Sequence, residues 1–311
     1  MAFLNALPGA VAQGLIWGLM AIGVYISYKI LDIADLTVDG SICTGACVCA
    51  VLIGLGVPAW VSVLAALLAG ALTGVVTGLL HTRLGIPAIL AGILTQLMLY
   101  TVNLLILGGK SLMSIDPRAN QLLVNMSNNN RSIVSLVIIV AITIFALYKF
   151  FYTEIGLTLK STGDNPDMSR AQGINVDRNK VVGLAIANAI VAMAGALLAQ
   201  YKGSANINDG RGAIVIGLAA IFIGLSVSLK IKPNFVVSLI GVVCGGIIYY
   251  VVYNVVILLG LKTDYLKMLS ALIVALFLGI PYLKTKYLTK QKDRYRAEVA
   301  KHTSPGGEGH A

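Results

Sequence analysis

Apolar runs of about 20 residues recur along the chain, and this is the length a helix needs to cross the hydrocarbon of a membrane. The runs are continuous instead of alternating, which excludes a transmembrane β-barrel. Charged residues make up only 12% of the chain, whereas a soluble globular domain has about 25%. The sequence therefore predicts an all-α polytopic membrane protein with about nine transmembrane or partly broken helices. We place them at residues 11–28, 41–57, 59–80, 87–107, 132–150, 181–200, 213–229, 234–259 and 265–283.

The first two runs and the glycines of the later ones indicate how the spans are built. The first has no basic segment before it and no small-residue cleavage site, so we expect a span and not a cleaved signal peptide. The second, 41–57, is short and is expected to be a broken or re-entrant element. Within the later runs, glycines recur at four-residue spacing, at Gly70, Gly74 and Gly78 and again at Gly241 and Gly245. This spacing lets helix backbones approach closely and predicts a packed bundle.

Lysine and arginine residues gather between the spans and in the tail, which is typical of membrane topology and not of a nucleic-acid surface. Three basic segments are separated by even numbers of predicted spans: the loop 154–180, the turn at Lys230 and Lys232, and the tail 284–311. Positively charged short loops stay in the cytoplasm, so we predict that all three are cytoplasmic, together with His81 and Arg83. Segment 108–131 then lies outside, and an odd number of spans places the N-terminus outside as well.

The loop between the fifth and sixth predicted spans carries the signals of a short, capped helix. Asn165 suits the position before the helix, Pro166 the first helical position, and Asp167 the positive helix end. Gly173 fits a left-handed stop, and Ile174 the apolar contact after it. An ordinary connecting loop is the alternative. A helix delimited in this way, on the water-exposed side of a membrane protein, predicts a docking element for a partner.

The sequence offers little for catalysis or metal binding. The three histidines form no HExxH pair, and the four cysteines form no CxxC pair, so we predict no catalytic residue and no metal site. Gly109-Lys110-Ser111 resembles the end of a phosphate-binding loop, but Leu104 stands where the first glycine belongs. We therefore expect no bound nucleotide or other cofactor, and no enzymatic activity in this chain.

Polar side chains inside the apolar runs are costly, and they must face the bundle or a cavity. The amides among them are Gln13, Gln96, Asn103, Asn188 and Asn254. Hydrogen bonding between helices is one role for each, and contact with a transported solute is the other. Thr37 and Asp39 stand beside a helix start at Gly40 and Ser41. There the carboxylate either caps the helix or binds the cationic end of a ligand.

Three segments then resemble a known family. The central one has Gly163, Asn165, Pro166, Arg170, Ala171, Gly173, Ile174, Asn175, Val176, Arg178 and Lys180, followed by Ala194 and Gly195 in the next span. The others are IADLTVDGSICTGA and GRGAIVIGLAAIFIGLS. Together they resemble permease subunits of ABC importers of the branched-chain amino acid and ribose permease superfamily. The resemblance covers most of residues 11–283 and is greatest to tryptophan/tyrosine-type, substrate-binding-protein-dependent permeases. One departure is Gly224-Leu225-Ser226, where such relatives often carry Gly-Glu.

The resemblance implies a single transmembrane permease domain at 1–283 with a coupling loop at 151–180, in the plasma (inner) membrane of a bacterium. It implies a cytoplasmic ABC ATPase that holds ATP and Mg, an extracytoplasmic binding protein that docks on loops such as 201–212, and a second permease subunit, expected to be an identical copy. The coupling residues would be Asn165, Pro166, Met168, Arg170, Ala171, Gly173, Ile174 and Arg178. The substrate path would involve Thr37, Asp39, Ser41, Gln96 and Asn188.

The cargo expected from this resemblance is an amino acid, with aromatic ones included. A nucleoside or a sugar is the alternative within the importer class. An ion-coupled secondary transporter is the alternative outside it, but the spans show no inverted repeats or coupling-ion site that such a protein needs.

Overall fold

The computed structural model of the chain describes residues 2–116, 122–228 and 234–258, together with helical positions 268, 272, 275 and 279. Apart from those four positions, the predicted span 265–283 and the basic tail 284–311 lie outside the described residues, as do Lys230 and Lys232.

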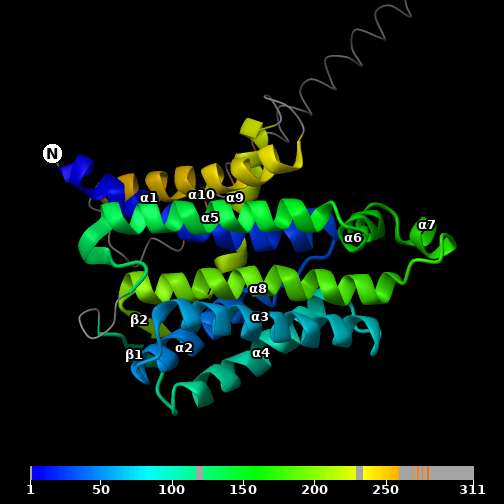
Figure 1. Cartoon of the computed structure of the whole chain (residues 1–311), viewed down its shortest axis with the longest axis horizontal. Coiled ribbons are helices and arrows are strands. Elements are labelled where there is room, and N and C mark those ends of the chain that lie inside the picture. The colour runs from blue at the N-terminus through cyan, green and yellow to red at the C-terminus, as the bar shows by residue number, and fades with distance from the viewer. Residues whose placement is uncertain are drawn as a thin grey trace, which may run out of the picture.

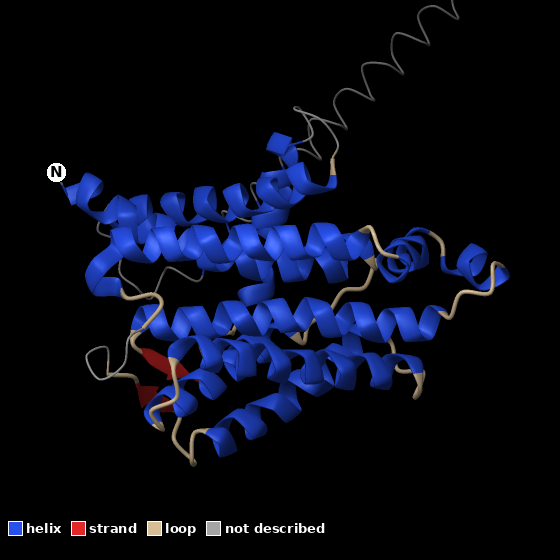
Figure 2. Ribbon diagram, in the orientation of Figure 1, coloured by secondary structure: helices blue, strands red, loops and turns tan. Residues whose placement is uncertain are grey.

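The described part is almost entirely helical (Figures 1 and 2). Its first half contains α1 (Ala2–Tyr25), the π-helical turn η1 (Ile26–Ile30), α2 (Val38–Gly54), α3 (Ala59–Thr82), α4 (Ala88–Ile106) and strand β1 (Leu112–Ser114). Its second half contains the 3-10 turn η2 (Met126–Asn128), α5 (Asn129–Phe151), α6 (Glu154–Asp164), α7 (Pro166–Ala171), α8 (Val176–Lys202), strand β2 (Ser204–Asn206), α9 (Ala213–Ser228) and α10 (Phe235–Leu258).

By length and composition, six helical stretches in the described part can cross a membrane, and two apolar helices, α2 and α9, are shorter. The six stretches are Leu7–Ile30, Ala59–Thr82, Ala88–Ile106, Met126–Phe151, Val176–Lys202 and Phe235–Ile257. These helices confirm the predicted all-α polytopic membrane protein. The second predicted run forms α2, which is one continuous helix and not a broken element, and its 17 residues extend only about 25 Å.

Helix α8 lies at the centre of the bundle. In Figure 1 it runs between a layer of α1, α5 and α10 and a second layer of α2, α3 and α4. It packs directly on α1, α2 and α3. Its middle is rich in small residues, such as Ala187, Ala192 and Gly195, which are buried and let neighbouring backbones come close. Helices α1 and α8 are accordingly the most buried spans of the described part.

Close glycine-mediated packing is confirmed along α3 and α10. A Cβ atom added at Gly70, Gly74 or Gly78 would collide with the backbone of α8. A Cβ atom at Gly245 would collide with the carbonyl oxygen of Ala220 in α9. Lipid provides no hydrophobic drive between helices, so close contacts of this kind help to hold the bundle together.

The predicted placement of successive loops at opposite ends of the bundle is also confirmed for the described residues. At one end of the bundle, Lys180 Nζ at the start of α8 lies 3.3 Å from His81 Nε2 at the end of α3. At the other end, β1 pairs with β2 in an antiparallel ladder with Leu112 opposite Asn206. The described residues of segment 108–131 and the basic loop around α7 therefore lie at opposite ends of the bundle.

Two local features differ from the prediction. Residues 154–164 form helix α6, which was expected to be part of a polar loop, and α8 begins at Val176 instead of residue 181. Helix α6 is held by packing, because a Cβ atom at Gly163 would collide with the carbonyl oxygen of Ile30. Between η1 and α2 the chain is irregular, and alternate residues are buried, with Asp35 only 2% exposed. Such backbone is tolerated at membrane depth only when it is surrounded by protein.

Candidate functional site

Helix α7 has the predicted caps at both ends. Asn165 Oδ1 accepts a hydrogen bond from the Met168 N–H at 3.0 Å, and Pro166 occupies the first turn. Gly173 adopts a left-handed conformation with φ of +79°. The N–H groups of Gly173 and Ile174 donate to the carbonyls of Arg170 and Ser169, each at 3.0 Å, which is the Schellman pattern of helix termination. The helix is therefore delimited on both sides by specific hydrogen bonds.

The outer face of α7 is uncovered. Met168 is 60% exposed, Arg170 and Ala171 are also exposed, and only Ser169 is buried. Arg170 lies 3.4 Å from Asp167 and 3.9 Å from Asp177. An exposed methionine beside an arginine, on a helix fixed by caps, forms a surface suited to a protein partner.

The other side of this region is anchored to the bundle. Asn179 Nδ2 in α8 donates to Thr162 Oγ1 in α6 at 3.0 Å, and Ser169 Oγ in α7 donates to Ser161 Oγ in α6 at 3.2 Å. Beside α7, a cleft of about 480 Å³ between the end of α3 and the start of α8 is lined by Arg83 and Arg178. Helix α7 is therefore joined to α8 by hydrogen bonds through α6 and by a short connection in the chain.

Three of the predicted path residues lie in a buried hydrogen-bond network. Asn188 Oδ1 accepts from Ser41 Oγ at 2.6 Å, and Asn188 Nδ2 donates to Asp35 Oδ2 at 2.6 Å. Asp35 Oδ1 accepts from the Thr37 N–H, and Thr37 Oγ1 lies 2.7 Å from Thr77 Oγ1. These contacts are the interhelical hydrogen bonds that the sequence left open as one role for such groups. They join α2, α3 and α8 around the irregular segment 31–37.

The other two predicted path residues, Asp39 and Gln96, line a separate cavity of about 350 Å³ between α2, α4 and the loop after β2. Both oxygens of the Asp39 carboxylate accept backbone N–H groups at 2.9 Å, from Gly212 and from Ile214 at the start of α9. Asp39 thus caps a different helix from the one expected. The cavity wall also includes Asn103 and Arg211. The sequence had left Asn103 open between hydrogen bonding within the bundle and contact with a solute, and it had not singled out Arg211.

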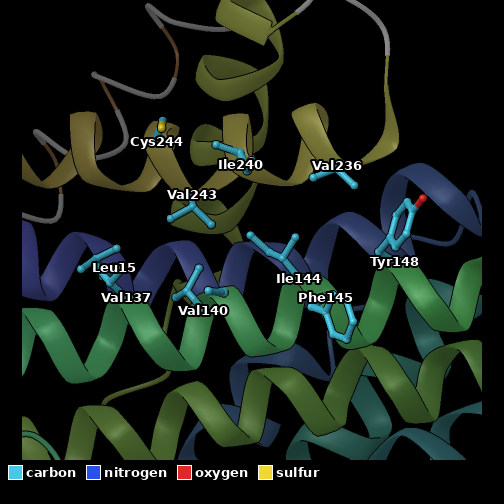
Figure 3. Close-up of a pocket in the computed structure, with 11 residues that line it drawn as sticks. Leu15, Val137, Val140, Ile144, Phe145, Tyr148, Val236, Ile240, Val243 and Cys244 are labelled. Carbon is cyan, nitrogen blue, oxygen red and sulfur yellow. The ribbon is translucent and has the colours of Figure 1, made fainter.

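A larger cavity of about 510 Å³ lies between α5 and α10 (Figure 3). Among the described residues, its wall carries no charged side chain and is formed by residues such as Val140, Phe145 and Ile240. A polar solute finds no hydrogen-bonding partner there apart from the hydroxyl of Tyr148 and the thiol of Cys244. The chemistry suited to a polar solute is therefore in the smaller cavity.

Comparison with known proteins agrees with this architecture. Residues 7–284 match the family described as branched-chain amino acid transport system, permease component. The chain belongs to this permease family. A tyrosine transport system permease protein of Clostridioides difficile is 34% identical over 277 residues, which cover 89% of this permease and 91% of that protein. An uncharacterized protein of Rickettsia prowazekii is 30% identical, covering 92% of this permease and 100% of that protein.

A ribose import permease protein of Escherichia coli is 26% identical to this permease over 276 residues, with coverage of 88% and 84%. No solved structure matches the permease. The family and the tyrosine and ribose relatives are named as permeases, so the chain is a transporter subunit of the ABC type and not an enzyme. Within the described residues, no group of three or more histidine, cysteine or acidic side chains is placed to hold a metal ion.

Proposed function

We propose that this permease is the transmembrane subunit of an ATP-driven importer for an amino acid, aromatic ones included. An extracytoplasmic binding protein delivers the amino acid. A separate cytoplasmic ATPase binds ATP and Mg and supplies the energy. A second permease subunit, an identical copy, completes the transmembrane part. The observation that carries the proposal is α7, a capped and exposed helix joined to the central span of the bundle.

The coupling step follows from the construction of α7. A partner that binds Met168 and Arg170 moves α7 as a rigid unit, because the caps at Asn165 and Gly173 prevent the helix from fraying. The cleft lined by Arg83 and Arg178 lies beside it and extends the docking surface. Ala171, Ile174 and Pro166 shape the ends of this surface. ATP-dependent closure of the ATPase then tilts the bundle between outward and inward openings.

The proposed orientation places the α7 end in the cytoplasm. Lys160, Arg170, Arg178 and Lys180 are concentrated there, and positively charged residues in short loops favour the cytoplasmic side. The tail 284–311 is proposed to share that side, in the plasma membrane of a bacterium. The β1–β2 end then faces outward and receives the binding protein on the loop 201–212.

An amino acid is proposed as cargo because the relative with 34% identity is named as a tyrosine permease. The polar cavity with Asp39 and Gln96 fits a small solute that carries charge. A sugar importer is the second candidate, favoured by the similarity to a ribose import permease.

Co-purification from gently solubilised membranes tests the proposal. The intact permease should capture a cytoplasmic ATPase, and replacement of 166–172 by a Gly-Ser linker should abolish the capture. Met168→Asp should weaken it, whereas Met126→Asp should not, because these methionines are similarly exposed, at 60% and 62%, but lie at opposite ends. Uptake that stops on loss of the ATPase and survives an uncoupler completes the test. Uptake that proceeds without any ATPase would favour an ion-coupled transporter and overturn the proposal.

A further inference from the structure

The 350 Å³ cavity contains a polar atom whose lack of a partner is unusual. Asn103 in α4 is only 1% exposed, and its side-chain oxygen Oδ1 has no hydrogen-bond partner among the described residues. Buried polar groups are normally paired, because leaving one unpaired costs free energy. Asn103 is also one of the residues that line the cavity. The missing partner is one that donates a hydrogen.

The same wall carries two opposite charges that do not neutralise each other. Asp39 and Arg211 both line the cavity, yet none of the ion pairs found among the described residues involves either of them. The Asp39 oxygens accept backbone N–H groups at the start of α9, and a carboxylate has room for a further donor. Arg211 is exposed and offers a guanidinium that matches a carboxylate. The cavity is therefore complementary to a molecule with separated positive and negative ends.

The rest of the wall is less polar. Leu97 and Tyr100 in α4 line it, and Tyr100 is 44% exposed. Gly40 brings α2 close to α4, because a Cβ atom there would lie 2.8 Å from Leu99 Cδ1 and 3.3 Å from the Cα of Gln96. The volume of the cavity lies within the range of roughly 300 to 1,000 Å³ that is typical of small-molecule sites in proteins.

We propose that this cavity binds the zwitterionic head of a free amino acid. Its ammonium is held by Asn103 Oδ1 and Asp39, its carboxylate by Arg211, and its side chain lies against Tyr100. The proposal rests on the importer function above and assigns the cargo site. A sugar or a nucleoside fits less well, since neither carries a carboxylate for Arg211 and a neutral ligand leaves both charges without a counterpart.

The test measures binding to the permease–ATPase complex in nanodiscs without the binding protein. The probes are radiolabelled L-tyrosine, tyramine, which lacks the carboxylate, and ribose. Wild type should bind tyrosine about tenfold or more tightly than tyramine, and ribose more weakly still, since a hydrogen bond to a charged group is worth about this factor.

Two variants separate the two ends of the ligand. Asn103→Leu should weaken tyrosine and tyramine alike by about tenfold or more, while Arg211→Gln should weaken tyrosine and leave tyramine unchanged. Asn254→Leu in α10 and Lys110→Gln in the outer loop are the matched controls, because neither residue lines the cavity. Asn103→Leu should unfold at the wild-type temperature or above it, since it removes an unpaired buried oxygen.

The outcomes distinguish this inference from the importer proposal. If Asn103→Leu and Arg211→Gln bind tyrosine as wild type does, the cavity is not the cargo site, whatever the uptake assay shows. Wild type that binds ribose in preference to tyrosine also overturns the inference. If tyrosine binds with the expected pattern but uptake does not need the ATPase, the inference stands and the coupling mechanism fails.

Discussion

Replacement of Gly173 tests whether coupling needs the fixed C-terminal end of α7. Its φ of +79° lies in the left-handed region, and a Cβ atom added there would meet no atom within 4 Å. A substitution at this position therefore acts through backbone conformation and not through a clash. Gly173→Ala, Gly173→Val and Gly173→Asn form a graded series, because asparagine visits the left-handed region more readily than alanine, and a β-branched valine is the least suited.

The expected magnitude follows from the hydrogen bonds at the stop. An L-residue in the left-handed conformation costs roughly 1–2 kcal/mol. The two Schellman hydrogen bonds, from Gly173 and Ile174, contribute together about 2 kcal/mol. The penalty for alanine is thus comparable to the interaction that closes the helix end. The C-terminal end of α7 should therefore fray about 5–30 times more often, since one or two kcal/mol changes an equilibrium by this factor.

Two assays examine this series. Amide hydrogen exchange at residues 173 and 174 reports the opening itself, and ATP-driven tyrosine uptake reports its effect on coupling. We expect exchange to become faster and uptake to fall, least in the Asn variant, more in Ala and most in Val. The amount of protein in the membrane and the melting temperature of the bundle should not change. If the Val and Asn variants import equally well, a rigid α7 is not required and the coupling argument is refuted.

Two further predictions concern the bundle. Gly74→Leu should lower the melting temperature in detergent, because the new side chain would collide with the backbone of α8, whereas Val76→Leu on the exposed face of the same helix should leave it unchanged. Asn188→Leu should destabilise the fold by on the order of 3 kcal/mol, since it leaves the buried Asp35 carboxylate short of a donor, and Asn254→Leu should have a much smaller effect in the same melting assay. If either variant melts at the same temperature as its control, the packing inferred for that residue is wrong.

The sequence predicted features that depend on local chemistry. Apolar length located the spans, and the residue types at 165, 166 and 173 located the ends of α7, because caps and left-handed stops are set by a few adjacent side chains. Helix α6 was missed for the opposite reason. Its glycines and threonines disfavour a helix in isolation, and packing of Gly163 against Ile30 stabilises it.

The division of polar residues into two groups was not predictable from the sequence. Asn188 and Asn103 are both amides inside apolar runs, yet the first has three hydrogen bonds and the second has an oxygen with no partner in the described part. Partners separated by more than 100 positions, such as Asp35 and Asn188, are brought together only by the tertiary fold. The contribution of Arg211 likewise depends on where the loop after β2 folds against α2 and α4.

The length of α8 has a mechanical consequence. Its 27 residues contain no proline and make a stiff rod of about 40 Å. Four residues separate its start from α7, and its end lies beside the strand that leads to Arg211. In the proposed coupling mechanism, this rod serves as the lever and its close glycine contact with α3 serves as the pivot. A push at α7 would then tilt α8 and change the width of the polar cavity at the other end of the bundle.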